Sequence, residues 1–165
     1  MTPLSVEIPQ RITQLLNSNT GLAPWIENIQ ITSGLRLPLI SPSSIVVSLA
    51  SADMLDKVQQ VSYPRIAVYT AKIENTLREK FRTVSGTATA AIAISVSSDA
   101  IQQAENNMHF YIEAVTDILS QNTGDWGNGL FFGGAYDVQL QPPKAGGIGF
   151  VQTATVSCAV NVSRN

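Results

Sequence analysis

Cysteine, histidine and charged residues are all scarce in this chain of 165 residues. The single cysteine, Cys158, permits neither an internal disulfide nor a thiolate cluster for zinc. Any catalytic triad would have to use the one histidine, His109. Charged residues make up 13% of the chain, about half of the roughly 25% found in typical domains. With 44% hydrophobic residues and a net charge of −2, the composition excludes a disordered chain and argues against a strongly basic nucleic-acid binder.

Long apolar runs and common catalytic motifs are also missing. The N-terminus has no basic region followed by an apolar run, so no signal peptide is expected. The most apolar early stretch, residues 35–50, is interrupted by Pro38 and Pro42 and is too short to cross a membrane. Neither a Gly-x-Ser-x-Gly elbow nor a phosphate-binding Gly-x-x-x-x-Gly-Lys-Ser/Thr loop occurs. We therefore expect a soluble cytoplasmic protein that is no enzyme and has no cofactor, catalytic residue or metal ligand.

The N-terminal part of the chain predicts one helix followed by an arm. Apolar residues recur at helical spacing within residues 4–17, where Pro9 is compatible only with the first turn. Residues 22–62 contain several prolines and a short apolar run at 45–47. This composition favours an extended arm or insertion with one strand and a turn of helix near residues 52–60.

Strands and one long helix are predicted after the arm. Residues 63–69 are apolar except for Arg65, and residues 86–96 alternate between apolar and polar with a period of two, which is typical of strands. From Asp99 the apolar residues switch to helical spacing up to about residue 122, and Asp99 with Gln102 forms a candidate capping box. This segment is therefore predicted to be the longest helix.

Two further alternating segments, 136–140 and 150–162, predict the strands that complete a sheet. The order helix, arm, strand, strand, helix, strand, strand favours an α+β fold. We expect a single domain over residues 1–165, with an antiparallel β-sheet of about four strands, helices packed on one face, and an extended N-terminal arm.

The few charges are sorted along the sequence. Residues 63–82 have a net charge of +3, whereas residues 83–143 contain six acidic residues and neither Lys nor Arg. This asymmetry favours self-association, in which a basic surface of one copy meets an acidic surface of the next. The alternatives are charges that only keep the surface solvated, or a nucleic-acid-binding module that uses the same cations. The candidate partner-binding residues are Arg65, Lys72, Arg78, Lys80 and Arg82.

A glycine-rich segment, residues 124–134, contains large apolar side chains. We expect it to be irregular, because it is so rich in glycine. Its apolar side chains either fold back over the core or anchor a partner, and Trp25 in the arm presents the same alternatives. The candidate partner-binding residues here are Trp126, Leu130, Phe131 and Phe132.

Two further patterns point only weakly to chemistry. Glu105, His109, Glu113 and Asp117 recur every four residues along the predicted helix, a spacing that would suit a metal ion. Since a solvated helix face produces the same spacing far more often, a small metal-assisted enzyme using His109 is kept only as an alternative function. Cys158 lies on the apolar face of a predicted strand, which favours a buried, unreactive thiol.

The order of elements from Tyr63 to Gln121 resembles that of the tail terminator proteins of long-tailed bacteriophages. In that family a strand of the form aromatic-Pro-x-Ile-x-Val follows an N-terminal helix, and here Tyr63-Pro-Arg-Ile-Ala-Val-Tyr69 has this form. A polar hairpin, a second strand, a helix opening at an acidic residue and a final strand pair complete the family's domain. The resemblance covers roughly residues 4–17 and 63–162.

This resemblance implies a structural virion protein at the neck, at the top of the tail, that is present in the host cytoplasm during assembly. Such proteins form a homo-hexameric ring that caps the tail tube, ends tail polymerisation and joins the tail to the head connector. The implied partners are the tail-tube protein and the head connector or neck protein, with the sheath protein as a further candidate. DNA passes through the lumen of such a ring without specific binding. Another head–tail adaptor protein at the same interface is the alternative.

Overall fold

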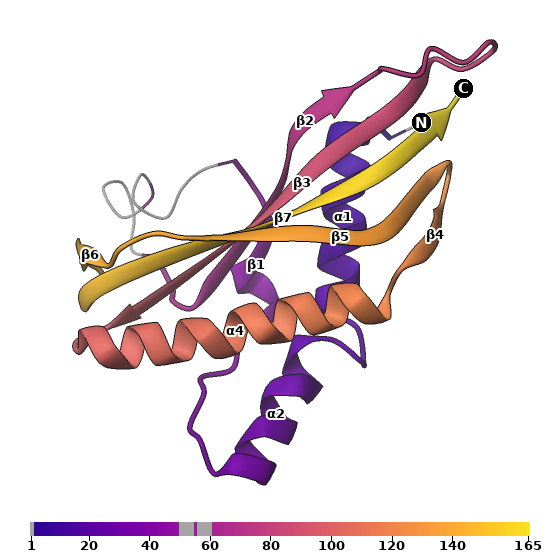
Figure 1. Cartoon of the computed structure of the whole chain (residues 1–165). Helices are drawn as coiled ribbons and strands as arrows, with labels where there is room; N and C mark the ends of the chain where they lie inside the picture. Colours follow the sequence, from indigo (N-terminus) through magenta and orange to yellow (C-terminus); the bar gives the residue numbers. More distant parts are fainter. Residues whose placement is uncertain (1, 50–54, 56–60) are drawn as a thin grey trace.

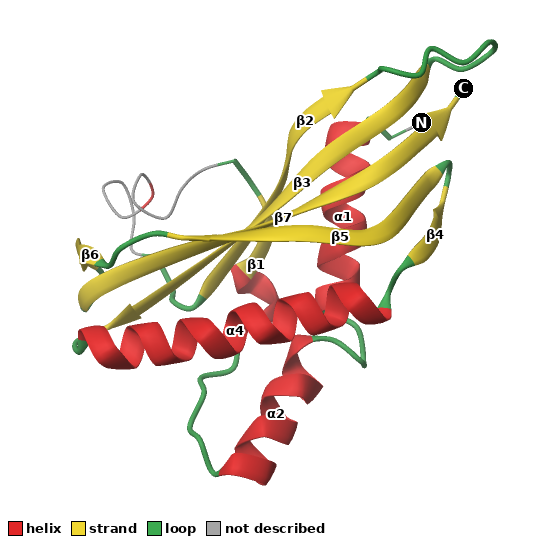
Figure 2. Cartoon of the chain, viewed as in Figure 1, coloured by secondary structure: helices red, strands yellow, loops and turns green. Residues whose placement is uncertain are grey.

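The computed structural model describes residues 2–49, 55 and 61–165. In this part of the chain, three α-helices lie beside one curled sheet of seven strands (Figures 1 and 2). In chain order the elements are α1 (Leu4–Leu16), α2 (Leu22–Ser33), the 3₁₀ helix η1 (Pro42–Ser44), β1 (Ile45–Val47), β2 (Arg65–Glu74), β3 (Val84–Ser98), α4 (Ile101–Gln121), β4 (Gly124–Gly127), β5 (Leu130–Leu140), β6 (Lys144–Gly146) and β7 (Gly149–Arg164).

The sheet is mixed, and its strand order is β1-β2-β3-β7-β5-β4, with β6 also paired to β7. Only β1 and β2 are parallel; all the other neighbours are antiparallel. The central pair is the longest, since β7 pairs with all 15 residues of β3. The predicted antiparallel sheet of about four strands is therefore wrong, although three helices beside one sheet remain compatible with the α+β class.

Besides missing the short strand β6, the prediction failed in two longer regions. The first is the arm: residues 22–33 form helix α2 instead of extended chain, and β1 joins the sheet edge in a parallel sense. The second is the glycine-rich segment, which forms β4 and the start of β5, because its glycines occupy the turn at positive φ and leave the flanking residues extended. The turn of helix predicted near residues 52–60 falls on a segment outside the described residues, apart from Leu55.

Helix α1 matches its prediction except for the position of Pro9. Ile8, Ile12 and Leu16 follow one another at four-residue spacing and are fully or almost fully buried. Pro9 lies in the second turn, where it lacks the N–H that would bond the carbonyl of Ser5. The hydroxyl of Thr70 in β2 donates to that carbonyl at 3.2 Å, so the sheet supplies the missing hydrogen bond.

Helix α4 crosses the same face of the sheet as α1 and contacts β3 and β7, while α2 packs on α4 (Figure 1). The predicted apolar stripe is confirmed at Ala104, Met108 and Leu119, which are fully buried. The predicted capping box is wrong: α4 starts at Ile101 and makes no side-chain cap. Instead, the hydroxyl of Ser98 accepts a hydrogen bond from the backbone N–H of Ala100 at 3.2 Å.

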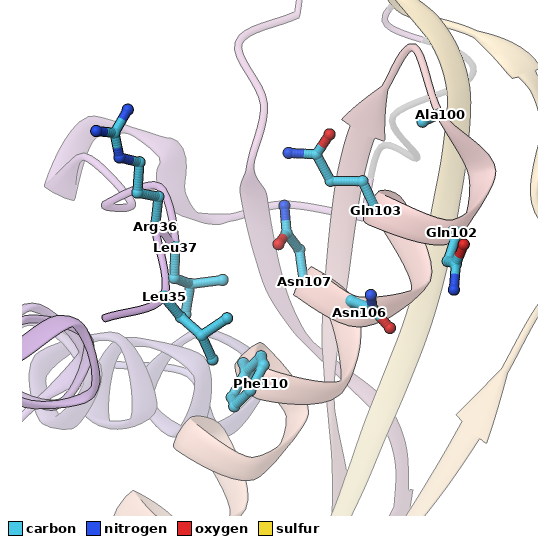
Figure 3. A pocket seen from close by; sticks show the side chains of 9 residues that line it. All are labelled: Leu35, Arg36, Leu37, Ala100, Gln102, Gln103, Asn106, Asn107 and Phe110. Carbon is cyan, nitrogen blue, oxygen red and sulfur yellow. The ribbon is translucent and has the colours of Figure 1, made fainter. Parts of the chain in front are cut away.

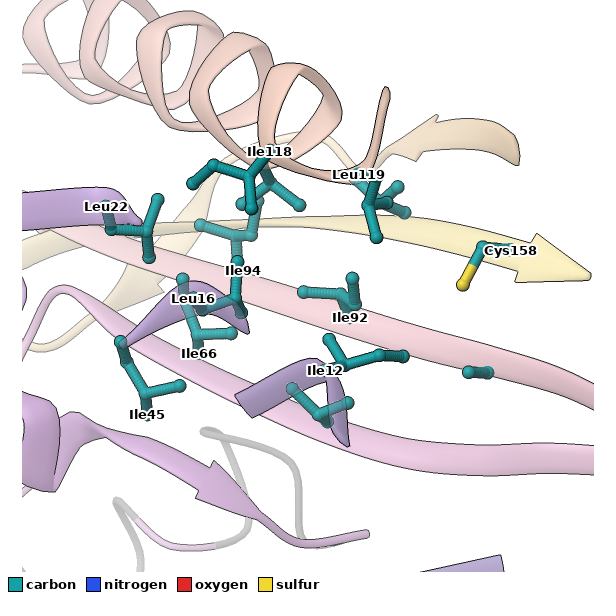
Figure 4. Close-up of a cluster of buried hydrophobic side chains, with 14 of the residues drawn as sticks. Ile12, Leu16, Leu22, Ile45, Ile66, Ile92, Ile94, Ile118, Leu119 and Cys158 are labelled. Atoms are coloured by element: carbon teal, nitrogen blue, oxygen red, sulfur yellow. The ribbon is translucent and has the colours of Figure 1, made fainter. Parts of the chain in front are cut away.

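The core lies between these helices and one face of the sheet (Figure 4). The alternating residues of β3 and β7 face it, as their period of two predicts. Their neighbours on the opposite face are mostly small and hydroxyl-bearing, and none of the three described helices covers that face (Figure 1). Residues of this outer face include Thr87, Thr89, Ser95, Thr153, Thr155 and Ser157.

Candidate functional site

The hairpin that connects β2 and β3 (residues 75–83) projects beyond the end of the sheet (Figure 1). It carries three of the predicted basic residues, Arg78, Lys80 and Arg82, and all three are exposed. The tip also presents apolar side chains, since Phe81 is 95% exposed and Leu77 is 67% exposed. Large apolar groups on a projecting cationic hairpin are typical of a contact surface.

The base of this hairpin is fixed to the end of β7. The carboxylate of Glu79 accepts hydrogen bonds from the hydroxyls of Ser85, at 2.7 Å, and Ser163, at 3.2 Å. These bonds, chiefly the one from Ser85, lower the pKa of Glu79. A guanidinium nitrogen of Arg82 donates to the side chain of Asn165 at 3.0 Å. The base is therefore held in place while the tip remains exposed.

The predicted basic set is divided between the two ends of β2. Arg65 begins the strand and is only 8% exposed, and its burial lowers its pKa. Lys72 lies about 23 Å further along an extended strand and pairs with Glu74 at 2.8 Å on the surface. The structure therefore groups Lys72 with the hairpin cations, while Arg65 lies apart from them.

Three of the four apolar residues in the glycine-rich segment belong to the core. Trp126 is 9% exposed, and Leu130 and Phe132 are more deeply buried. The rings of Trp126 and Phe132 lie 5.2 Å apart, and the indole N–H of Trp126 donates to the carbonyl of Asn122 at 2.8 Å. Only Phe131, on the outer face and 49% exposed, is available to a partner.

The turn between β4 and β5 is tied to both ends of the chain. The amide of Asn128 donates to Glu7 of α1 at 2.7 Å, and Glu7 forms an ion pair with Arg164 at the end of β7. The hydrogen bond from Arg164 is the main cause of the lowered pKa of Glu7. No local sequence pattern indicates this network, because its members are more than 30 residues apart.

The carboxylate–histidine line on α4 is not assembled around a common point. Trp25 of α2 donates its indole N–H to Asp117 at 3.1 Å, so this carboxylate serves the contact between two helices. Within the described residues, no group of three or more His, Cys, Asp or Glu side chains could hold a metal ion. Trp25 is partly buried against the core. Cys158 is buried as predicted, and burial raises the pKa of its thiol to about 12.

A pocket of about 450 Å³ lies between the segment after α2 and the first half of α4 (Figure 3). Hydrogen bonds from Gln30 to the carbonyl of Leu37, and from Tyr111 to that of Pro38, both 2.5 Å long, hold the segment against the helices. The pocket lining is rich in carboxamides and comprises Leu35, Arg36, Leu37, Ala100, Gln102, Gln103, Asn106, Asn107 and Phe110. The sequence does not indicate this pocket, because residues 22–62 are predicted to be an extended arm.

A second pocket, of about 470 Å³, lies on the outer face of the sheet at the base of the β2–β3 hairpin. Leu77 and Glu79 of the hairpin and Phe131 of β5 line it together. Two residue sets that the sequence suggested separately, the basic hairpin and the glycine-rich segment, therefore meet at one end of the sheet.

Among the described strands, both sides of the sheet leave part of an edge strand unpaired. β1 covers β2 only at residues 66–68, so no described strand pairs with the outer side of residues 69–74. β4 covers β5 only at residues 130–132, so the outer side of residues 133–140 has no described strand partner either. Exposed strand edges of this kind are templates for pairing with another chain.

No protein-family model matches the chain, and no curated protein is significantly similar to it. None of the described helices is both long enough and apolar enough to span a bilayer.

Proposed function

We propose that this protein is a structural subunit that assembles head to tail with copies of itself. The observation that carries this proposal is the pair of open edges, residues 69–74 of β2 and residues 133–140 of β5, on opposite sides of one sheet. A contact between two different edges is heterologous, and such a contact closes a ring when its repeated rotation adds up to a full turn.

The particular function proposed is that of a tail terminator of a long-tailed bacteriophage. In this role a hexameric ring caps the tail tube, ends tail polymerisation and joins the tail to the head connector in the virion. The number six, the neck position and the tube, sheath and connector partners rest on the resemblance of residues 63–121 to that family. Another head–tail adaptor at the same interface is the alternative within this class.

Two features of the described residues support a subunit that is packed among others. The outer face of β3 and β7 carries small hydroxyl side chains and alanines, so covering it desolvates few charges. The cation Lys72 lies on β2 at one side of the sheet, while the acidic residues Asp125 and Asp137 lie on β4 and β5 at the other. Opposite charges on opposite sides favour a contact between unlike surfaces of identical copies.

The test is the oligomeric state of the purified full chain, alone and with tail-tube protein. Mass photometry over increasing concentration, followed by electron microscopy of the largest species, is expected to show closed rings of six copies. A strict monomer at every concentration, with and without tail-tube protein, would overturn the proposal. Rings that bind the head connector but leave tube length unchanged would replace the terminator with another neck protein.

A further inference from the structure

The two open edges, on β2 and β5, differ in their charges, in their exposed apolar side chains and in the elements beside them. Each of these differences affects how two copies can bind each other. We propose that residues 69–74 of β2 in one copy pair, antiparallel, with residues 135–139 of β5 in the next copy, so that the sheet continues from subunit to subunit. This inference rests on the proposed self-assembly and names the contact that performs it.

Strand direction favours this junction. The strands between the two edges run in the order β2, β3, β7, β5, and each is antiparallel to its neighbour. Because their number is even, β5 runs opposite to β2. Copies related by rotation about an axis roughly along the strands keep these directions, so β5 of one copy meets β2 of the next as an antiparallel pair.

The unpaired stretches are also similar in length, six residues on β2 and eight on β5. On β2 the open residues begin after the last residue paired with β1, Val68, and end where the projecting hairpin starts. On β5 they begin after the last residue paired with β4, Phe132, and end with the strand at Leu140. An antiparallel pairing that places residues 72–74 opposite 137–135 and, across the bulge between Thr70 and Lys72, residues 69–70 opposite 139–138 therefore clashes with neither β1 nor β4.

On the hairpin side of the bulge between Thr70 and Lys72, the side chains agree with one register. In an antiparallel pair, directly opposite residues point to the same face. Lys72 and Asp137 both point to the outer face, and Ile73 and Tyr136 both point to the helix-covered face, as their pairing with β3 and β7 shows. Placing Lys72 opposite Asp137 puts Ile73, which is 42% exposed, opposite Tyr136, which is 43% exposed. One register thus joins opposite charges on one face and apolar groups on the other.

The same register brings the hairpin of one copy to β4 of the next. In the first copy, the chain after Glu74 continues as the β2–β3 hairpin. In the neighbouring copy, the part of β5 before Gly134 lies beside this hairpin and is paired with β4, which carries the exposed Asp125. The cations Arg78 and Lys80 then face an acidic strand. Lysine on an edge strand opposes pairing with another β2, so the same residue disfavours a symmetric dimer and favours the unlike edge.

A charge-swap experiment tests the junction. Lys72→Glu and Asp137→Lys are each expected to raise the concentration needed for half-maximal assembly by roughly tenfold, because each places like charges opposite one another. The double variant K72E/D137K restores the attraction and is expected to assemble nearly as well as the wild type. Glu113→Lys, on the exposed face of α4, changes the net charge by the same amount as Asp137→Lys; it is the matched control for that variant and is expected to assemble normally.

Disulfide trapping fixes the register and the direction. With Ile73→Cys and Tyr136→Cys in one chain, mild oxidation is expected to give a ladder of covalent multimers that ends at the size of the ring. A mixture of the two single variants is expected to stop at dimers, because each copy then has one thiol at the junction. Ile73→Cys combined with Ile31→Cys, on α2 and 83% exposed, is the matched control and is expected to give no ladder. The native Cys158 is 1% exposed and does not compete.

The outcomes separate this inference from the proposed function. Rings that form in the wild type but yield no ladder from the I73C/Y136C variant, or that tolerate both single charge reversals, overturn the junction and leave self-assembly intact. A wild-type chain that is monomeric throughout overturns both. Dimers in either single cysteine variant alone indicate a symmetric contact and overturn the head-to-tail arrangement.

Discussion

The β2–β3 hairpin and the β4–β5 segment are both strand connections at the same end of the sheet, yet they treat their aromatic residues in opposite ways. In the first, Phe81 is 95% exposed; in the second, Phe132 is fully buried. Phe132 lies on a strand that pairs with β7 and faces the core, whereas Phe81 lies beyond the last strand pair. An aromatic residue in a glycine-rich or polar connection is therefore buried when its segment pairs with the sheet in a register that points the side chain to the core. When the segment does not pair with the sheet, the side chain stays exposed and can contact a partner.

The largest difference in the free energy of unfolding between the two segments is expected when each phenylalanine is replaced by alanine. Phe132→Ala should lower the free energy of unfolding by about 3–5 kcal/mol, because it removes a fully buried ring beside Trp126. Phe81→Ala should change it by less than about 0.5 kcal/mol, since its side chain is exposed. Urea unfolding of the monomeric chain, followed by circular dichroism, measures both values. Equal losses for the two variants would contradict the contrast between the segments.

A smaller effect is expected in the β4–β5 turn. Gly129 has φ +76°, and a Cβ there would lie 2.0 Å from the carbonyl oxygen of Ser163, so Gly129→Ala forces the backbone to move. We expect a loss of at least about 2 kcal/mol in the free energy of unfolding, which also includes the cost of positive φ. Gly127→Ala is the matched control: φ is +84°, but nothing lies within 4 Å of its Cβ, and it should lose only about 1 kcal/mol. Similar losses for both would exclude the close approach to Ser163 as the cause.

The smallest effect concerns the ion pair that ties this turn to the chain ends. Because hydrogen bonding, chiefly from Arg164, lowers the pKa of Glu7 below its ordinary 4.5, the ionised carboxylate contributes stability above that pH and loses it as the pH falls through the folded-state pKa. Glu7→Gln should therefore lower stability by about 1 kcal/mol at pH 7 and flatten the loss of stability below pH 4.5. Thermal unfolding from pH 7 to pH 3 measures this difference. A variant whose stability falls as steeply as that of the wild type would show that another group carries the acid dependence.

The sequence predicted the elements whose own periodicity identifies them. Helix α1, strand β3 and helix α4 were found with boundaries close to those observed, because burial of one face imposes a period of 3.6 or 2 on the residues themselves. Helix α2 was missed, since a proline near its start and weak amphipathicity resemble an arm. β4 was missed, because its glycines indicate a loop unless the neighbouring strand is known.

The candidate site was only partly predictable for a related reason. The cations Lys72, Arg78 and Lys80 were identified from charge alone, and they do lie together at one end of the sheet. Arg65 belongs to the same cluster in the sequence, but the strand carries it to the other end and buries it. No sequence pattern indicates the open edge of β5, because an edge is open only where no other described strand pairs with that side of the strand.

The amino-acid sequence by itself determined the faces of the regular elements, the burial of Cys158 and the separation of basic from acidic segments, since all three follow from residue type and local spacing. Only the tertiary structure decided which apolar residues of the glycine-rich segment are buried, how many described strands the sheet has, and that both of its sides retain stretches without a described strand partner. These properties depend on hydrogen bonds and contacts between residues far apart in the chain, which no local pattern encodes.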